Sequence, residues 1–124
     1  MNIELIQQIF EQIEENLPQG WQKMALRFED VPNVKTSIKY YVSDKDGYKE
    51  CFETVKDIRT LYPALVKIKD LLIEEKKKLS AKEQWTVFTL LVDSEGDFNA
   101  YYDYNYNAEN QAEYEKAWEQ KYLK

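Results

Sequence analysis

The chain has 124 residues and a formal net charge of −6, and 44% of its residues are hydrophobic. This length and composition predict one folded domain with a hydrophobic core, spanning residues 1–124. The chain has no His and one Cys, which excludes Ser-His-Asp and Cys-His catalytic sites, His-containing zinc sites and an internal disulfide.

The negative net charge argues against a broad contact with nucleic acid and favours a basic partner. Neither GxGxxG nor GxxxxGK[ST] is present, so both phosphate-binding loops that can be recognised from sequence are missing. No apolar run is long enough to span a membrane. The N-terminus MNIELIQQIFEQIEE has neither the basic nor the apolar region of a signal peptide. We therefore expect a cytoplasmic protein with no nucleic-acid partner, no membrane partner and no cofactor.

The first predicted element is an amphipathic helix over residues 2–17, which Asn2 can cap and LPQG (17–20) ends. Its apolar residues follow the spacing of one helical face: Ile3, Ile6, Ile9, Phe10, Ile13 and Leu17. Alternating apolar and polar residues then predict strands over 21–29 and 34–42, and SDKDG (43–47) predicts the hairpin turn that follows the second of them.

Residues 48–55 are compatible with a third strand or with a helix that starts near Phe52. A second long helix is predicted from about Thr60 to about Leu79, with Thr60 as its cap and Pro63 in its first turn. Residues 84–92 and 97–106 predict two strands joined by the tight turn DSEG. A last helix should follow, capped by Asn107 or Asn110. It would present Tyr114, Ala117, Trp118 and Tyr122 on one side.

This order predicts an α+β domain. Its antiparallel sheet would have four to five strands, with helices at the N-terminus, in the middle and at the C-terminus. The single thiol, Cys51, is expected to be a small core residue rather than a nucleophile. The other predicted core residues are Phe10, Ile13, Phe28, Ile38, Leu65, Leu72, Phe88 and Leu90.

Two acidic groups could suggest a metal ion, but neither predicts one. The run from Val42 to Glu53 matches an EF-hand loop at Asp44, Asp46, Gly47 and Glu53, but its first position is Val42, which cannot bind calcium. The acids of the DSEGD turn could hold a hard cation, but acids around a turn are commonly solvated. We therefore predict no metal site.

Paired carboxylates for catalysis are not indicated either. Asp97 and Asp103 fall on one face of a predicted strand, but a separation of six residues is about 20 Å, which is too far for a glycosidase pair. We predict no catalytic residue. The alternative that the residues leave open is a small ligand-binding domain, or an enzyme of α+β type that depends on carboxylates and Tyr hydroxyls.

The negative charge is concentrated in one segment. From Glu83 to Glu115 there are eight acidic residues and no Lys or Arg. In the last predicted strand, Tyr102, Tyr104 and Tyr106 share the Phe98 face and are expected to pack in the core or against a helix. The opposite face combines one aromatic residue with acids and amides, which is typical of a protein-binding surface and also fits a solvated one. The candidate binding residues are Asp93, Glu95, Asp97, Asn99, Tyr101, Asp103 and Asn105.

The layout resembles the YezG-like immunity family. The resemblance covers about residues 3–106 and rests on the first helix with WQKMALRF, the strand IKYYV, the long helix TLYPALVKIKDLLIEE, and a last hairpin that Trp85 opens and FNAYYDY closes. It implies a non-enzymatic cytoplasmic bacterial antitoxin, a monomer or weak dimer, that binds a toxin domain. The toxin implied is a secreted protein with a basic surface, such as a nuclease, whose active site would be blocked or distorted.

Overall fold

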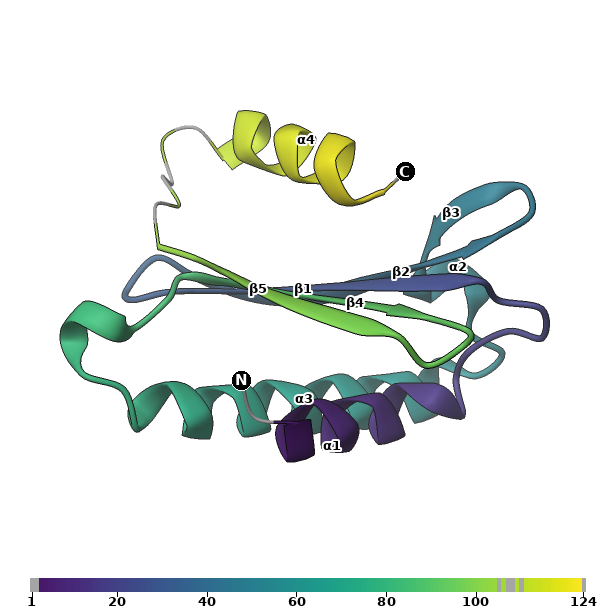
Figure 1. Cartoon of the computed structure of the whole chain (residues 1–124), viewed down its shortest axis with the longest axis horizontal. Coiled ribbons are helices and arrows are strands. Elements are labelled where there is room, and N and C mark those ends of the chain that lie inside the picture. The colour runs from purple at the N-terminus through teal and green to yellow at the C-terminus, as the bar shows by residue number, and fades with distance from the viewer. Residues whose placement is uncertain (1–2, 105, 107–108, 110, 124) are drawn as a thin grey trace.

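Five strands form one antiparallel sheet in the part of the chain that the computed structural model describes, which is residues 3–104, 106, 109 and 111–123. The strands lie in the order β3-β2-β1-β4-β5 (Figure 1). Their bounds are β1 Lys23–Val31, β2 Lys35–Asp44, β3 Gly47–Glu50, β4 Val87–Asp93 and β5 Phe98–Asp103. The predicted α+β fold is confirmed, because each neighbouring pair of strands is antiparallel.

Helices cover both faces of this sheet. The first, α1 (Ile3–Glu14), and the long α3 (Ile58–Lys77) pack on one face, and α4 (Gln111–Tyr122) lies over the other (Figure 1). Two short elements, α2 (Cys51–Thr54) and the 3-10 turn η1 (Ala81–Glu83), join the longer ones. Helices therefore occur at the N-terminus, in the middle and at the C-terminus, as predicted. Among the described residues, none of the helices has both the length and the apolar character needed to cross a membrane.

The predicted apolar face of the first helix is buried in α1 only in part. Ile6, Ile9 and Ile13 are buried, as is Leu5, which was not predicted, whereas Ile3 is 58% exposed at the start of the helix. The helix ends at Glu14, three residues earlier than Leu17, because the last amides bond three residues back: Leu17 N donates to the carbonyl of Glu14 at 3.2 Å. The proposed cap, Asn2, lies outside the described residues, as do Asn107 and Asn110.

The start of α3 differs from the prediction. Asp57, not Thr60, caps the helix, because its Oδ1 accepts the backbone N–H of Arg59 at 2.9 Å. Thr60 lies inside the helix, where its hydroxyl donates to Asn16 Oδ1 on the loop after α1 at 2.7 Å. Pro63 consequently lies in the second turn, where its missing N–H leaves the carbonyl of Arg59 without its usual intrahelical donor.

The ambiguous segment 48–55 contains both predicted alternatives. β3 ends at Glu50, and α2 begins at the next residue, Cys51. Gly47 opens β3 with φ 114°, a conformation that side chains disfavour, which explains the Asp-Gly pair in this hairpin. Cys51 is fully buried, as expected of a core residue.

The main core lies between the sheet and the pair α1 and α3. Six of the predicted core residues are buried there: Ile13, Phe28, Leu65, Leu72, Phe88 and Leu90. Phe10 and Ile38 are only partly buried and pack against this cluster from its edge. At the centre of the sheet, Phe28 pairs with Ile38 on one side and with Phe88 on the other. The sheet position of the β4–β5 hairpin is thus fixed by core packing on β4.

Candidate binding surface

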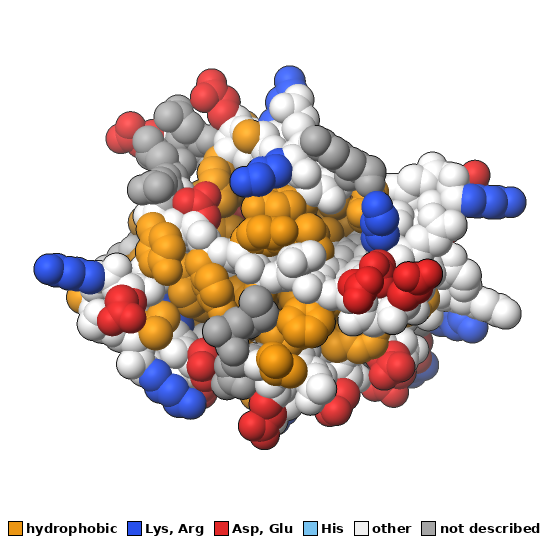
Figure 2. Space-filling view, viewed as in Figure 1, with side chains coloured by type: hydrophobic (Ala, Val, Ile, Leu, Met, Phe, Trp, Pro, Cys, Tyr) orange, Lys and Arg blue, Asp and Glu red, His pale blue; other side chains and the backbone are white. Residues whose placement is uncertain are grey.

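The β4–β5 hairpin carries the predicted binding residues and forms one edge of the sheet. Figure 2 shows hydrophobic side chains gathered along this edge, with acidic and basic side chains around them. Tyr101, Tyr102 and Tyr104 are exposed, at 42%, 41% and 52%. The expectation that Tyr104 packs in the core or against a helix is wrong, and it holds only in part for Tyr102, whose ring contacts Phe88 at 5.4 Å between centroids. The edge position of β5 explains this, since no further strand among the described residues covers its outer side.

The turn between β4 and β5 is organised by Asp93. Its Oδ1 accepts the backbone N–H groups of Glu95, at 2.9 Å, and of Asp97, at 3.0 Å. Gly96 takes φ 96° in this turn, which glycine adopts without strain. Asp93 is half-buried, whereas Glu95 and Asp97 are exposed. Among the three acids of the turn, Asp93 therefore holds the turn together, and Glu95 and Asp97 are open to a partner.

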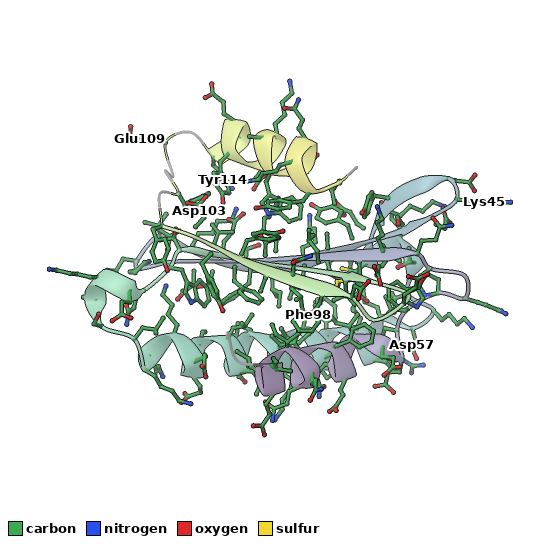
Figure 3. All side chains as sticks on the ribbon, in the orientation of Figure 1. Lys45, Asp57, Phe98, Asp103, Glu109 and Tyr114 are labelled. Carbon is green, nitrogen blue, oxygen red and sulfur yellow. The ribbon has the colours of Figure 1, made fainter. Side chains whose placement is uncertain are left out.

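The polar face of β5 points toward α4, which the sequence pattern did not predict. Figure 3 shows Asp103 and Tyr114 pointing toward one another between strand and helix, and the Tyr114 hydroxyl donates to Asp103 Oδ2 at 2.9 Å. The rings of Tyr101 and Tyr122 lie 5.5 Å apart. This face is thus a shared surface of β5 and α4 rather than a bare strand face. Asn105, the last predicted binding residue, lies outside the described residues.

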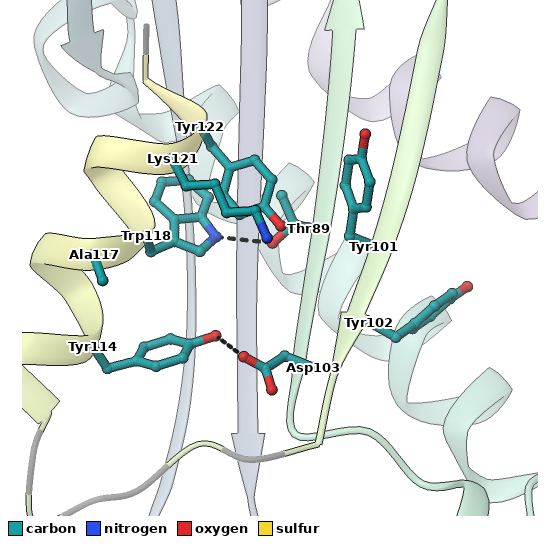
Figure 4. Close-up of a pocket in the computed structure, with 9 residues that line it drawn as sticks. All are labelled: Thr89, Tyr101, Tyr102, Asp103, Tyr114, Ala117, Trp118, Lys121 and Tyr122. Carbon is teal, nitrogen blue, oxygen red and sulfur yellow. Dashed lines mark hydrogen bonds between the residues drawn. The ribbon is translucent and has the colours of Figure 1, made fainter.

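Two hollows run along this face of β5, and Tyr122 lines both. The larger, of about 440 Å³, lies between Thr89, Tyr101 and Asp103 of the strands and Tyr114, Trp118, Lys121 and Tyr122 of α4 (Figure 4). The smaller, of about 220 Å³, includes Asp93, Asp97 and Asn99. We call these two hollows together the β5 groove. It brings together five of the seven predicted residues, leaving Glu95 on the adjoining turn and Asn105 undescribed.

The Tyr hydroxyls of the groove are set up as hydrogen-bond donors. Burial raises the pKa of Tyr114, and its hydrogen bond to Asp103 and the negative charge of that carboxylate raise it further. Burial also raises the pKa of Tyr102, with a smaller contribution from the charge of Glu75. Both phenols are therefore protonated at neutral pH, and neither is suited to act as a base.

Buried charges lie under α4 on the same face of the sheet. Glu29 is 1% exposed, and its two carboxylate oxygens lie 3.1 Å from Arg27 Nε and 3.0 Å from Lys35 Nζ. Both distances are short enough for ion pairs, but neither Glu29 oxygen accepts a hydrogen bond with good geometry. Lys35 Nζ also pairs with Glu115 of α4 at 3.2 Å. Burial lowers the pKa of Lys35, but its contacts with Glu29 and Glu115 outweigh this and raise the pKa overall.

Trp118 is the central contact of α4 with the sheet. It is 4% exposed, and its indole N–H donates to Thr89 Oγ1 at 2.8 Å. The guanidinium of Arg27 lies over its ring, 4.8 Å from the centroid, and Tyr41 packs beside it at 5.6 Å. One aromatic anchor and several polar contacts therefore hold α4. Nearby, Tyr106 packs on Tyr114 of α4 rather than on the Phe98 face.

Sequence reasoning missed that the C-terminal helix lies over the polar face of β5. The signal was present: Tyr114, Trp118 and Tyr122 recur every four residues, which marks a helix face that must pack on something. With the apolar sheet face already required by the two other helices, the polar face was the one left to receive them. Its charged residues obscured this interpretation.

No group of three or more His, Cys, Asp or Glu residues could hold a metal ion within the described ranges. Asp44 instead organises its own turn, since its Oδ1 accepts the N–H of Asp46 at 2.7 Å. The absence of a metal site stays a prediction, which thermal unfolding with and without EDTA would check: a chelator should leave the midpoint unchanged.

Two comparisons with known proteins concern the chain as a whole. The profile of a protein family described as "Immunity protein YezG-like" matches residues 3–124, nearly the whole chain. No curated protein matches the chain.

Proposed function

The chain belongs to the YezG-like immunity protein family, and we propose that it neutralises a toxin domain with a basic surface, such as a nuclease, by binding it along the β5 groove and the adjoining turn. Membership of the family indicates an immunity role, a toxin as partner and a non-enzymatic activity. The observation that carries the choice of surface is the segment from Glu83 to Glu115, which has eight acidic residues and no base. It includes the β4–β5 hairpin, and three of its acids, Asp93, Asp97 and Asp103, line the groove.

Charge complementarity supports a basic partner. A nuclease must hold phosphates with Lys and Arg side chains, and an acidic surface with an aromatic anchor matches such a site in charge. The exposed Glu95 and Asp97 would speed the encounter, because charges at the rim of an interface act mainly on the association rate. Tyr101, which is 42% exposed, would provide buried contact area and slow dissociation.

Inhibition of this kind needs no chemistry from the chain. A bound immunity protein that covers the phosphate-binding surface prevents the toxin from reaching its substrate. The complex would form in the cytoplasm of the cell that makes the toxin, from one copy of the chain per toxin domain.

A co-expression experiment tests the proposal. The toxin domain encoded beside this chain would be expressed together with wild type, with Asp97→Lys or with Glu74→Lys, and cell survival measured. Glu74 is the matched control, because it is exposed on α3 at the opposite face of the sheet and undergoes the same change of charge. We expect wild type and Glu74→Lys to protect and Asp97→Lys to lose protection. Equal protection by all three, at equal protein level, would contradict the proposed surface.

A second candidate follows from the shape of the groove. Its larger hollow, about 440 Å³, is lined by Tyr and by Asp103, which suits a small polar ligand as well as a side chain of a partner. A ligand that binds the native state raises the midpoint of thermal unfolding as its concentration increases. A panel of small polar aromatic and cationic compounds that leaves the midpoint unchanged would exclude this candidate.

A further inference from the structure

The outer side of β5 presents backbone groups that no described strand pairs with. Asp93 N donates to the carbonyl of Asp97 at 2.9 Å, just outside the pair Val92 and Phe98. In an antiparallel ladder this makes Val92 and Phe98 a non-hydrogen-bonded pair, and the bonded pairs alternate from Asn99 onward. The N–H and C=O groups of Asn99, Tyr101 and Asp103 therefore face β4. Those of Phe98, Ala100 and Tyr102 point outward.

Hollows lie beside this edge on both faces of the sheet. On the α4 face lies the β5 groove. On the other face, a hollow of about 450 Å³ is lined mainly by apolar residues such as Ile6, Phe10 and Phe98, together with Glu11. Another, of about 320 Å³, is lined by Trp85, Tyr102 and Tyr104, together with Glu75 and Glu83. Side chains of a strand alternate between the two faces of a sheet. A strand added beside β5 would therefore place its side chains into hollows above and below in turn.

We propose that the partner of this chain adds an extended segment with alternating basic and apolar side chains to β5, as a sixth strand of the sheet. The inference rests on the proposed function for the identity of the partner, and it specifies how that partner binds. Main-chain hydrogen bonds to Phe98, Ala100 and Tyr102 would supply affinity, and the hollows on the two faces would select the side chains. The apolar side chains would face Phe10 and Phe98, and the basic ones would face the groove.

The positions of the acids specify the charge of the segment. Asp97 directly precedes β5 and Asp103 ends it, and both line the groove on the α4 face. Directly opposed unlike charges on neighbouring strands are favourable, and like charges are unfavourable. Lys or Arg side chains opposite these two carboxylates therefore fit the groove face. Two cations, Lys23 and Lys121, also line the groove. Lys121 has its Nζ 5.3 Å from the ring centroid of Tyr122, and its removal should favour a basic segment.

The same acids disfavour a second copy of this chain as the occupant. The antiparallel register that pairs all three outward residues is centred on Ala100, with Phe98 opposite the copy's residue 102. In that register Asp97 lies opposite the copy's residue 103, so two pairs of carboxylates face one another. β5 itself has no Lys and no Pro, which proteins commonly use to protect a free edge. β5 is therefore free to pair with another strand, but the carboxylates of Asp97 and Asp103 favour a basic strand over a second copy of this chain.

Ala100→Pro and Ala100→Val test the main-chain contact. Proline removes the outward N–H of residue 100 without removing a bond to β4, and edge strands tolerate such a proline. Valine is the control, because it adds similar bulk but keeps the N–H. The probes would be the toxin domain encoded beside the chain and two synthetic peptides of about eight residues, long enough for one strand. One peptide alternates Lys and Val, and the other alternates Glu and Val.

Amide hydrogen exchange on the wild-type protein provides the second measurement, which does not depend on how the variants fold. With the Lys-Val peptide or the toxin domain bound, the amides of Phe98, Ala100 and Tyr102 should become protected, while those of Asn99 and Tyr101 are protected already. Ala100→Pro should weaken both interactions about tenfold, as expected for the loss of an edge hydrogen bond. Ala100→Val should bind like wild type, Lys121→Ala should bind the Lys-Val peptide more tightly, and the Glu-Val peptide should not bind.

Strand addition would be overturned if the three outward amides gain no protection, or if folded Ala100→Pro and Ala100→Val bind the toxin domain equally well. It would also be overturned if sedimentation shows that the chain alone forms a dimer and hydrogen exchange shows that the three amides are protected in that dimer. These outcomes differ from a failure of the proposed function. If Asp97→Lys still protects cells, the proposed surface is wrong. If toxin binding needs Asp97 but does not need the N–H of residue 100, the proposed surface stands and only the added strand is rejected.

Discussion

The two faces of the sheet bury different kinds of residues. Under α1 and α3 lies a continuous cluster of aliphatic and aromatic side chains, which includes Phe28, Leu72 and Phe88. Under α4 the described hydrophobic core consists of Ala25, Tyr41 and Trp118, with partly buried side chains around them. Beside it are the buried charges of Arg27 and Glu29. Apolar area removed from water stabilises a fold in proportion to its extent, so the first face contributes most of the stability.

The second face separates binding from folding. Its helix is held by the Trp118 indole, the Lys35–Glu115 ion pair and the hydrogen bond from Tyr114 to Asp103. These contacts can be changed singly without opening the main core. A protein that must match one particular partner can vary such a face while its core stays constant. If this comparison is right, substitutions in the first face should change stability and leave binding intact. Substitutions in the groove should do the reverse.

The largest expected effect is on the first face. Phe88→Ala removes a fully buried ring that contacts Trp85 and Tyr102, and it should lower the free energy of unfolding by about 4 kcal/mol. Phe52→Ala makes the same change at a residue that is 38% exposed and should cost about 1 kcal/mol or less. Urea denaturation would measure both. Equal losses would show that the core is not concentrated under α1 and α3.

The next largest effect should come from the buried charges under α4. Glu29→Gln removes the carboxylate that pairs with both Arg27 and Lys35. Arg27 then loses its buried carboxylate partner, whereas Lys35 keeps Glu115, and the change should cost about 3 kcal/mol. Glu74→Gln is the control, because its ion pair with Lys77 is exposed at 71% and 68% and should contribute less than about 1 kcal/mol. A Glu29→Gln protein as stable as wild type would show that the buried charges under α4 do not contribute to stability through Glu29.

The elements of this fold could be predicted from local patterns. The apolar spacing of α1 and the alternation in β1, β2 and β4 are repeated signals, and core packing agrees with them. The boundaries were less predictable, because single hydrogen bonds decide them: Asp57 rather than Thr60 accepts the first amide of α3. Residues 48–55 change from strand to helix within one residue, which no periodicity can show over so short a segment.

The groove was predicted only in part. Charge counting and strand alternation identified Asp97, Asn99, Tyr101 and Asp103 as one polar face. They could not show that α4 lies over this face, because the contacts involved join residues far apart in the chain. Trp118 bonds to Thr89, and Tyr114 to Asp103. Alternation likewise placed Tyr104 with the core, since sequence does not show that β5 ends the sheet.

Binding should respond to the groove and turn in graded steps. Tyr101→Ala and Asp103→Lys should each weaken binding of the toxin domain by about 2 kcal/mol, which is roughly thirtyfold in Kd. Glu95→Lys, on the turn, should lower the association rate modestly and reduce its dependence on salt. Surface binding at two salt concentrations would measure this, with circular dichroism as the control for folding.

Because Asp103 also bonds to Tyr114, Tyr114→Phe is the matched variant for Asp103→Lys. It removes that hydrogen bond but keeps the carboxylate. If Tyr114→Phe weakens binding as much as Asp103→Lys does, Asp103 acts by positioning α4 rather than by contacting the partner. Folded variants of Tyr101, Asp103 and Glu95 that all bind like wild type would make the hairpin a solvated surface only.

The smallest expected effect is a dependence on pH at the junction of α4 and the sheet. Burial raises the pKa of Glu115, but hydrogen bonds from Gln111 and Lys35 outweigh this and lower it below its ordinary value of 4.5. A carboxyl with a lowered pKa in the folded state stabilises the fold above its unfolded pKa, and this contribution is lost as the pH falls through the folded pKa. Wild type should therefore exceed Glu115→Gln in stability at neutral pH by less than about 1 kcal/mol, since the pair is partly exposed. The difference should shrink at pH values below 4.5.

Glu113→Gln, an exposed neighbour on the same helix, should show no such difference at either pH. A gap between wild type and Glu115→Gln that stays constant into acid would mean that Glu115 acts through packing and not through its charge.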